Sequence, residues 1–332
     1  MKKVLILFGG ESSEHYVSCK SAKSVIENLD IKKFEYEVCG IDFDNTWYKF
    51  CDDLSYLEKG CWKDANILKI DNVVNYVKEF DVVFPVTHGT NGEDGKLQGM
   101  LELFNVPFVG CKTLSSSIGM DKEMSKIIFD HLGIKQVPYV VINDDYKLED
   151  IMSMLDFPLI VKPANGGSSI GINKVNNKKE LIKGIKEAKK YDTKIIIEKF
   201  INARELEVAV LENKKNIICS KPGEIKSANE FYDYDAKYVN SKSTTLIPNN
   251  LPDDVLKTIK TYALKVFRGL NCTGYARIDF FYDESNEEVY INEINTIPGF
   301  TTISMYPKLM EEACIKYKDL ITILINGAND KF

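Results

Sequence analysis

The sequence has few of the features that mark zinc-binding, secreted or membrane-spanning proteins. Its three histidines, His15, His88 and His131, are too far apart in sequence to form a local zinc motif. The eight cysteines include no Cys-x-x-Cys pair, which predicts reduced, mostly buried thiols instead of a disulfide framework. The apolar run at residues 4–8 is shorter than a signal-peptide core and far shorter than a membrane span. We therefore expect a cytoplasmic protein with no membrane contact and no soft-metal site.

An excess of basic charge is also missing. The chain carries 43 Lys and Arg against 49 Asp and Glu, a net charge of −6, which argues against nucleic acid as the main partner because phosphate backbones need clustered cations. The balance of 44% hydrophobic and 28% charged residues is typical of a soluble globular protein. A chain of 332 residues is long enough for two or three packed subdomains with a cleft between them.

Strands and helices alternate in the first third of the chain. Residues 4–8 form a short apolar strand, and apolar side chains then recur at helical spacing from Ala22 to Leu29. The same order returns with a strand at 81–87 and a helix around Leu97 to Phe104, followed by a strand at 107–110. Alternating elements predict an open, mainly parallel sheet whose ligands bind at the carboxyl ends of the strands.

A single helix is expected over residues 115–131, with Met120, Met124, Ile127 and Ile128 on its apolar face. After Gly133, which ends this helix, the pattern changes. Beyond it strands dominate, which predicts an α+β, mostly antiparallel arrangement. The expected strands are 157–162, 170–175, 194–201 and 205–211, the last paired with 216–221, and the expected helices are 178–190 and 253–270.

The glycine-rich turn at residues 9–14 feeds a helix N-terminus, where backbone N–H groups attract an anion. It lacks the Gly-x-Gly-x-x-Gly spacing of a dinucleotide fingerprint, which argues against a nicotinamide dehydrogenase. An ordinary capped turn is the alternative. The carboxylate of Glu14 adds a second option, because it can bind the ammonium group of a substrate.

Two further turns combine glycine with polar side chains. Residues 88–95 contain three glycines at the end of a strand, which fits either a flexible loop or close approach of a ligand. Residues 162–171 place Lys162 beside a glycine-serine hairpin that lacks the Gly-Lys-Ser/Thr of a P-loop. Amides and an ammonium together suit a polyphosphate clamp, and a mobile hairpin with an exposed lysine is the alternative.

Residues 224–247 show little periodicity but are rich in aromatic side chains. A structureless segment of this length in a compact domain is usually functional or disordered, and the aromatic content argues against disorder. We therefore expect an active-site lid from which Lys237 and Tyr238 reach inward.

A predicted hairpin near the C-terminus carries polar side chains on one face of each strand. Two carboxylates and an amide would suit magnesium that bridges nucleotide phosphates, whereas a solvated polar face is the alternative. A Pro-Gly turn at 298–299 would expose backbone N–H groups beside this site. The residues expected to share a face are Arg277, Asp279 and Phe281 on the first strand and Ile291, Glu293 and Asn295 on the second.

Taken in order, these segments resemble the D-alanine:D-alanine ligase family of the ATP-grasp superfamily over nearly the whole chain. Any one motif is weak evidence, whereas seven in series are specific. The matching segments are 9–18, 88–95, 120–122, 162–171, 231–238, 277–279 and 293–299.

The resemblance implies an N-terminal α/β part that precedes a two-subdomain ATP-grasp fold. The ranges are 1–112 for binding the first substrate, 113–202 for the central subdomain and 203–332 for the C-terminal subdomain with lid and metal site. ATP would be held between the last two. A homodimer is implied by family habit.

The resemblance also assigns roles to individual residues. ATP phosphates would be bound by Lys122, Lys162, Ser169 and Lys237. Adenine and ribose would contact Glu198, Lys199, Phe200, Ile201, Glu205 and Phe281. Two Mg²⁺ ions, for which Mn²⁺ can substitute, would be bound by Asp279, Glu293 and Asn295. The first D-alanine would meet Glu14, His88, Ser168 and Tyr238, and the second Ser304 and the Gly299 amide, with Arg277 and that amide facing the oxyanion.

The chemistry so implied is ATP-dependent formation of D-alanyl-D-alanine through an acyl phosphate, for peptidoglycan synthesis. A D-serine acceptor is the alternative within the family, although apolar Ile303 and Met305 favour D-alanine. A catalytically silent ATP-binding protein is the alternative from another class, and the intact lysines and carboxylates argue against it.

Overall fold

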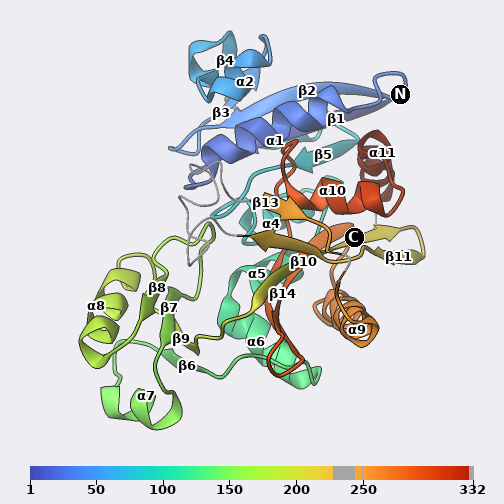
Figure 1. The fold of residues 1–332 in the computed structure, drawn as a ribbon. Helices are drawn as coiled ribbons and strands as arrows, with labels where there is room; N and C mark the ends of the chain where they lie inside the picture. Colours follow the sequence, from blue (N-terminus) through green and yellow to red (C-terminus); the bar gives the residue numbers. More distant parts are fainter. Residues whose placement is uncertain (227–243, 249, 329–332) are drawn as a thin grey trace.

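The computed structural model describes residues 1–226, 244–248 and 250–328, which form three sheets with flanking helices (Figure 1). Lys237 and Tyr238 lie outside the described residues. The described ends of the predicted lid are paired strands, because Glu224 of β12 lies opposite Leu246 of β13. No helix in the described part of the chain has the length and apolar character that crossing a bilayer requires.

The N-terminal sheet has the order β4-β3-β2-β1-β5. Strand β1 runs parallel to β5, as predicted, and also to β2, a strand that was not predicted, whereas β3 and β4 add an antiparallel edge. Its strands are β1 (Lys2–Gly9), β2 (Phe34–Ile41), β3 (Trp47–Phe50), β4 (Ile67–Lys69) and β5 (Val82–Pro85). Its helices are α1 (His15–Glu27), α2 (Ser55–Lys59), η1 (Trp62–Asp64), α3 (Val73–Val77) and α4 (Lys96–Leu103).

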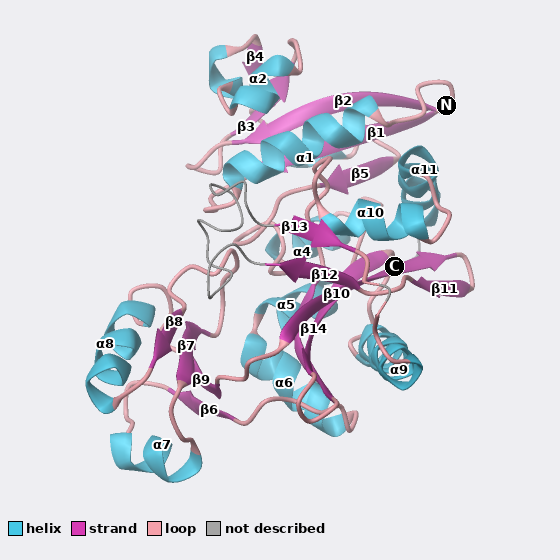
Figure 2. Ribbon diagram, viewed as in Figure 1, coloured by secondary structure: helices cyan, strands magenta, loops and turns pink. Residues whose placement is uncertain are grey.

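The other two sheets are antiparallel throughout, which confirms the predicted change of architecture (Figure 2). The four-stranded sheet β6-β9-β7-β8 consists of β6 (Tyr139–Ile142), β7 (Leu159–Pro163), β8 (Asn173–Val175) and β9 (Ile195–Lys199), with α7 (Leu148–Met154) and α8 (Lys178–Ala188). The C-terminal sheet β13-β12-β10-β14-β15, with β11 paired to β10, consists of β10 (Arg204–Asn213), β11 (Asn216–Cys219), β12 (Gly223–Lys226), β13 (Thr244–Leu246), β14 (Tyr275–Asp283) and β15 (Glu288–Asn295), with α9 (Asp253–Gly269).

The single helix predicted over residues 115–131 is wrong, because the structure has two helices, α5 (Thr113–Met120) and α6 (Lys122–His131). Asp121 ends the first in an extended conformation and caps the second by accepting the N–H groups of Glu123 and Met124. The predicted apolar face is also wrong for α6, where Met124 and Ile127 are exposed. The side chains that α6 buries are Ser125, Lys126 and Phe129.

The end of the chain returns to the N-terminal sheet. Helices α10 (Met305–Glu312) and α11 (Tyr317–Gly327) share one hydrophobic core with β1 and α1, and Phe300 lies fully buried in it (Figure 1). This packing brings the 297–300 loop beside the N-terminal strands. Each of the three sheets falls within one of the predicted ranges, although this core spans two of them.

Two chain segments also cross with their backbones in contact. A methyl group on Gly274, which has φ +67°, would lie 3.1 Å from the Cα and N atoms of Gly110, whose own φ is +113°. Only glycine allows both the left-handed conformation and the close approach.

Candidate active site

A cavity of about 880 Å³ lies where the three sheets meet. Most of the predicted substrate and metal residues line it, although they come from distant parts of the sequence. The predicted site residues that line it are Glu14, His88, Lys122, Ser168, Ser169, Arg277, Glu293, Asn295, Gly299 and Ser304.

Glu14 lies immediately before α1, where its side chain makes no capping hydrogen bond. Two glycines from other segments approach its carboxylate closely. A methyl group on Gly89 would come within 3.0 Å of Glu14 Oε2, and one on Gly167 within 2.9 Å. The two glycine-rich turns therefore form a narrow recess around this carboxylate, a geometry suited to a small ammonium group.

The acidic hairpin forms as predicted, with Asp279 of β14 directly opposite Glu293 of β15. A register shift after Asp279 then pairs Phe280 with Ile291. For this reason the prediction that Ile291 shares a face with Glu293 is wrong, and Ile291 is fully buried in the hydrophobic core. On the other side of Asp279 the partner in β10 is Glu207, so three carboxylates lie in a row across three strands.

Arg277 stands beside this row of acids. Its Nε and Nη2 atoms donate to the two carboxylate oxygens of Asp279 at 2.8 and 2.7 Å, and Nη2 lies 3.2 Å from Glu207 Oε1. Burial works against its charge, but the Asp279 and Glu207 carboxylates hold the pKa of the guanidinium well above its ordinary value. Arg277 is therefore a fixed cation at the wall of the cavity.

The donor set of the hairpin fits Mg²⁺ in its chemistry. Asp279 and Glu293 are like charges directly opposite each other, an arrangement that a cation between them would relieve. Asn295 donates its amide N–H to Asp279 at 3.0 Å, which turns its amide oxygen away from that carboxylate. Within the described ranges no group of three or more His, Cys, Asp or Glu is arranged for a metal ion. Two carboxylates and an amide leave coordination positions to water and phosphate oxygens, as Mg²⁺ prefers.

The loop at residues 297–300, which carries Gly299, is held by side chains from the N-terminal part of the chain. Ile297 N–H donates to Glu93 Oε1 at 3.0 Å, and Phe300 N–H donates to Ser21 Oγ at 3.3 Å. His88 Nδ1 lies 2.9 Å from the Ile297 carbonyl oxygen, which can only accept. Nδ1 therefore carries the proton, and Nε2 accepts from the Ser21 hydroxyl at 2.8 Å.

The buried positions of His88 and Glu93 shift the pKa of both side chains. Burial lowers the pKa of His88, although the Glu14 charge works in the opposite direction. Burial and then the same Glu14 charge raise the pKa of Glu93 to about 7. His88 is thus a neutral ring with both nitrogens engaged at the edge of the cavity.

Ser304 lies close to Gly299, because a methyl group on that glycine would come within 2.8 Å of Ser304 Oγ. The hydroxyl of Ser304 also pairs with that of Thr301 at 2.7 Å. Lys122 begins α6 and donates from Nζ to the Gly166 carbonyl oxygen at 2.7 Å, while the same Nζ lies 3.8 Å from Glu293. It thereby joins the glycine-serine hairpin to the acidic hairpin.

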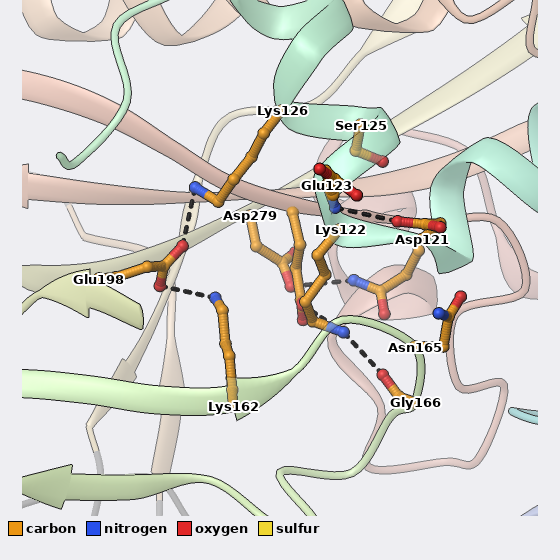
Figure 3. A network of polar contacts seen from close by, with 12 residues as sticks. Asp121, Lys122, Glu123, Ser125, Lys126, Lys162, Asn165, Gly166, Glu198 and Asp279 are labelled. Atoms are coloured by element: carbon orange, nitrogen blue, oxygen red, sulfur yellow. Dashed lines mark hydrogen bonds and ion pairs between the residues drawn. The ribbon is translucent and has the colours of Figure 1, made fainter. Parts of the chain in front are cut away.

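Figure 3 shows three of the predicted nucleotide residues, Lys122, Lys162 and Glu198, in one network of polar contacts. Lys162 Nζ is paired with Glu198 Oε2 at 2.7 Å, and both side chains are buried. Glu205 of β10 lies directly opposite Phe281 of β14, so the residues predicted for ribose and adenine are neighbours.

Three predicted residues follow Glu198 at the end of β9. Lys199 donates to the carbonyl oxygens of residues 156 and 157, so its ammonium group is engaged outside the cavity. The N–H group of Phe200 donates to the carbonyl oxygen of Pro158, and Ile201 is partly exposed. The partly exposed apolar side chains of Phe200 and Ile201 suit contact with a purine ring.

Three residues of these networks were missing from the predicted site, as was Lys126, whose Nζ lies 2.7 Å from Glu198 Oε1. Glu207 had a signal, because Glu205 and Glu207 alternate along one predicted strand. Ser21 and Lys126 had none, since each occupies an ordinary polar position of a predicted helix. Glu93 belonged to a recognised motif, but its contact with Ile297 spans 204 residues of sequence.

Comparisons with known proteins show similarity to a single family of ligases. Models described as D-ala D-ala ligase N-terminus and D-ala D-ala ligase C-terminus match residues 3–111 and 128–326. A D-alanine--D-alanine ligase of Clostridium acetobutylicum is 47% identical over 336 residues, 98% of each chain. One of Clostridium novyi is 44% identical over 339 residues, 99% of this chain and 98% of the relative.

Solved structures give the same result. The crystal structure of VanG D-Ala:D-Ser ligase from Enterococcus faecalis superposes with a TM-score of 0.89 at 36% identity, covering 98% of both chains. The D-alanine-D-alanine ligase from Coxiella burnetii superposes with a TM-score of 0.85 at 33% identity, covering 98% of this chain and 93% of that one.

Proposed function

The chain belongs to the D-alanine–D-alanine ligase family and joins two D-alanine molecules in an ATP-dependent reaction, and we propose that the cavity described above is where the reaction takes place. The product, D-alanyl-D-alanine, serves peptidoglycan synthesis. The observation that supports this site is the meeting of Glu14, Arg277 and Gly299 in one cavity. A carboxylate for an ammonium group, a fixed cation and a backbone N–H are the groups that this ligation needs.

The first half of the reaction activates a carboxylate, which is a poor electrophile. Glu14 binds the ammonium group of the first D-alanine, with Ser168 beside it. A carboxylate oxygen of this substrate attacks the γ-phosphorus of ATP, and the bond from that phosphorus to the bridging oxygen breaks. D-Alanyl phosphate and ADP result, while Lys122 and Lys162 neutralise the phosphate charge.

The second half forms the peptide bond. The neutral amine of the second D-alanine, bound near Ser304, attacks the carbonyl carbon of D-alanyl phosphate. Arg277 and the Gly299 N–H stabilise the tetrahedral oxyanion, and inorganic phosphate then leaves with the electrons of the C–O bond while the amine loses a proton. Lys237 and Tyr238 of the predicted lid exclude water, which would otherwise hydrolyse the acyl phosphate.

Nucleotide and metal binding complete the proposal. The segment Glu198–Ile201 borders the adenine with Phe281 packed on it, and Glu205 and Ser169 bind ribose and phosphate. Asp279, Glu293 and Asn295 of the acidic hairpin would hold two Mg²⁺ ions, for which Mn²⁺ can substitute. When bound, the ions would supply positive charge that neutralises the phosphate.

An acceptor panel with product masses tests the function. ATP turnover should require Mg²⁺ and D-alanine, should not respond to L-alanine, and should give D-alanyl-D-alanine. D-Serine is the alternative acceptor because the VanG D-Ala:D-Ser ligase has a closely similar fold. Ile303 and Met305 line the cavity and favour the methyl side chain. Absence of any dipeptide would refute the proposal. If D-alanyl-D-serine were the main product, D-serine would replace D-alanine as the proposed second substrate.

We also propose that the enzyme works in the cytoplasm, where ATP is available, and that it forms a homodimer, as its family habitually does. Light scattering on the purified protein tests the second point. A monomer at micromolar concentration would contradict it.

A further inference from the structure

Lys126 of α6 is almost completely buried, with 1% of its surface exposed. Its Nζ lies 2.7 Å from Glu198 Oε1, while Lys162 Nζ lies 2.7 Å from the other oxygen, Oε2. In Figure 3 the two lysines approach the Glu198 carboxylate from opposite sides. Lys126 does not line the cavity.

With both lysines protonated, the three side chains carry one positive charge in excess. Burial lowers the pKa of Lys126, and the Glu198 carboxylate opposes that shift. Among the described residues, Glu198 is the acid with which both Lys126 and Lys162 form an ion pair. Asp130 is the next acid, but its oxygens accept from Gln136 and Tyr139. Burial of an unbalanced charge is costly, so the cluster favours an incoming anion.

Both lysines also stabilise the negative charge of the Glu198 carboxylate. Burial alone would raise the pKa of Glu198, but Lys126 and then Lys162 lower it to about 2. The carboxylate is therefore ionised at neutral pH. Because it has two partners, it can lose one of them without being left as a buried, unpaired anion.

We propose that Lys126 is a positioning residue for nucleotide binding: it holds Glu198 from behind, so that Lys162 can turn from Glu198 to the phosphates of ATP. This inference rests on the proposed assignment of Lys162 to those phosphates. Lys126 itself touches neither substrate. Without it, Lys162 and Glu198 form a one-to-one pair, and any movement of Lys162 toward phosphate leaves Glu198 unpaired.

The test compares a phosphate-bearing ligand with one that lacks phosphate. Isothermal titration calorimetry on the full chain measures binding of a non-hydrolysable ATP analogue and of adenosine. Lys126→Met should weaken the analogue by roughly 10- to 100-fold, the range for weakening one hydrogen bond to a charged group, and change adenosine less than about 3-fold. Lys126→Gln, which keeps a donor but loses the charge, should show the same selective loss if the methionine variant does not fold.

Two further variants complete the design. Lys194→Met is the matched control, because Lys194 also pairs with acids of the α6 N-terminus, Asp121 and Glu123, but makes no contact with Glu198. It should keep the wild-type ratio of the two affinities. The double variant Lys126→Met/Glu198→Gln should restore much of the wild-type ratio of analogue affinity to adenosine affinity, since no carboxylate then holds Lys162 away from phosphate.

Failure of the inference and failure of the site assignment give different results. If Lys162→Met leaves the ratio of analogue to adenosine affinity unchanged, the assignment of Lys162 to phosphate is wrong. If Lys162→Met weakens the analogue selectively but Lys126→Met weakens both ligands equally, Lys126 only shapes the pocket, and the inference is overturned.

Discussion

Replacing Ser21 with alanine should impair catalysis from a residue that does not touch the substrates. Its hydroxyl accepts the N–H group of Phe300 and donates to His88 Nε2, and all three groups are buried. Ser21→Ala leaves both partners unsatisfied. Each such group costs about 1–3 kcal/mol, so the 297–300 loop should lose roughly 2–6 kcal/mol of the interactions that hold it.

The loop carries the Gly299 amide, which we place at the oxyanion. Removing an oxyanion donor costs about 100- to 1000-fold in kcat, and misplacing a group by about 1 Å costs on the order of 100-fold. A loosened but intact loop should therefore lower kcat by roughly 10- to 100-fold. The KM for ATP should change little, because the nucleotide residues lie elsewhere.

Steady-state release of ADP with saturating D-alanine measures this effect. Ser18→Ala is the matched control, since Ser18 lies on the same helix, is equally buried, and uses its hydroxyl to accept from Gly9 and donate to Val86. It should lower the melting temperature by a similar amount with little change in kcat. Equal kcat in the two variants would refute the idea that Ser21 positions the loop.

Three further predictions concern the cavity and its surroundings. Glu293→Gln should reduce kcat far more than nucleotide affinity, because metal charge matters most in the transition state, and equal losses in both would contradict the metal role. Gly167→Ala should raise the KM for D-alanine by displacing Glu14, whereas Gly327→Ala, which would meet no atom within 4 Å, should be neutral in the same kinetic assay. Burial raises the pKa of Glu93 from its ordinary value of 4.5 to about 7 in the folded state, so the folded state keeps a proton that the unfolded state has lost, and stability should fall as pH rises from 4.5 to 7. The slope is about 1.4 kcal/mol per pH unit at most, and Glu93→Gln should flatten the melting temperature across this range; parallel curves would exclude Glu93 as the source.

Local sequence patterns predicted the fold well where the structure depends on neighbours in sequence. The β10–β11 pairing and the face shared by Arg277, Asp279 and Asn295 follow from strand period and short connections. The glycine-rich turns were also predicted, because positive φ values restrict the choice of residue. In the N-terminal sheet, however, only β1 and β5 were predicted, and β2, β3 and β4 were not.

Errors arose where a distant part of the chain decides the outcome. Nothing in the local pattern singled out Lys126, yet it is buried and paired with Glu198, 72 positions away. Ser21 and His88 acquired their roles only when the chain end folded back onto the N-terminal sheet. The register shift after Asp279 could not be predicted either, because no glycine or proline marks it.

The crossing of Gly110 and Gly274 has a consequence for the inheritance of this fold. The codons for Gly110 and Gly274, 164 positions apart, are constrained together, since a side chain at Gly274 would come within 3.1 Å of the Gly110 backbone and the positive φ of Gly110 disfavours a side chain there. No change at the other can compensate, because each is already the smallest residue. Recombination between relatives should therefore preserve this pair wherever both parents carry it, even when the surrounding segments are exchanged.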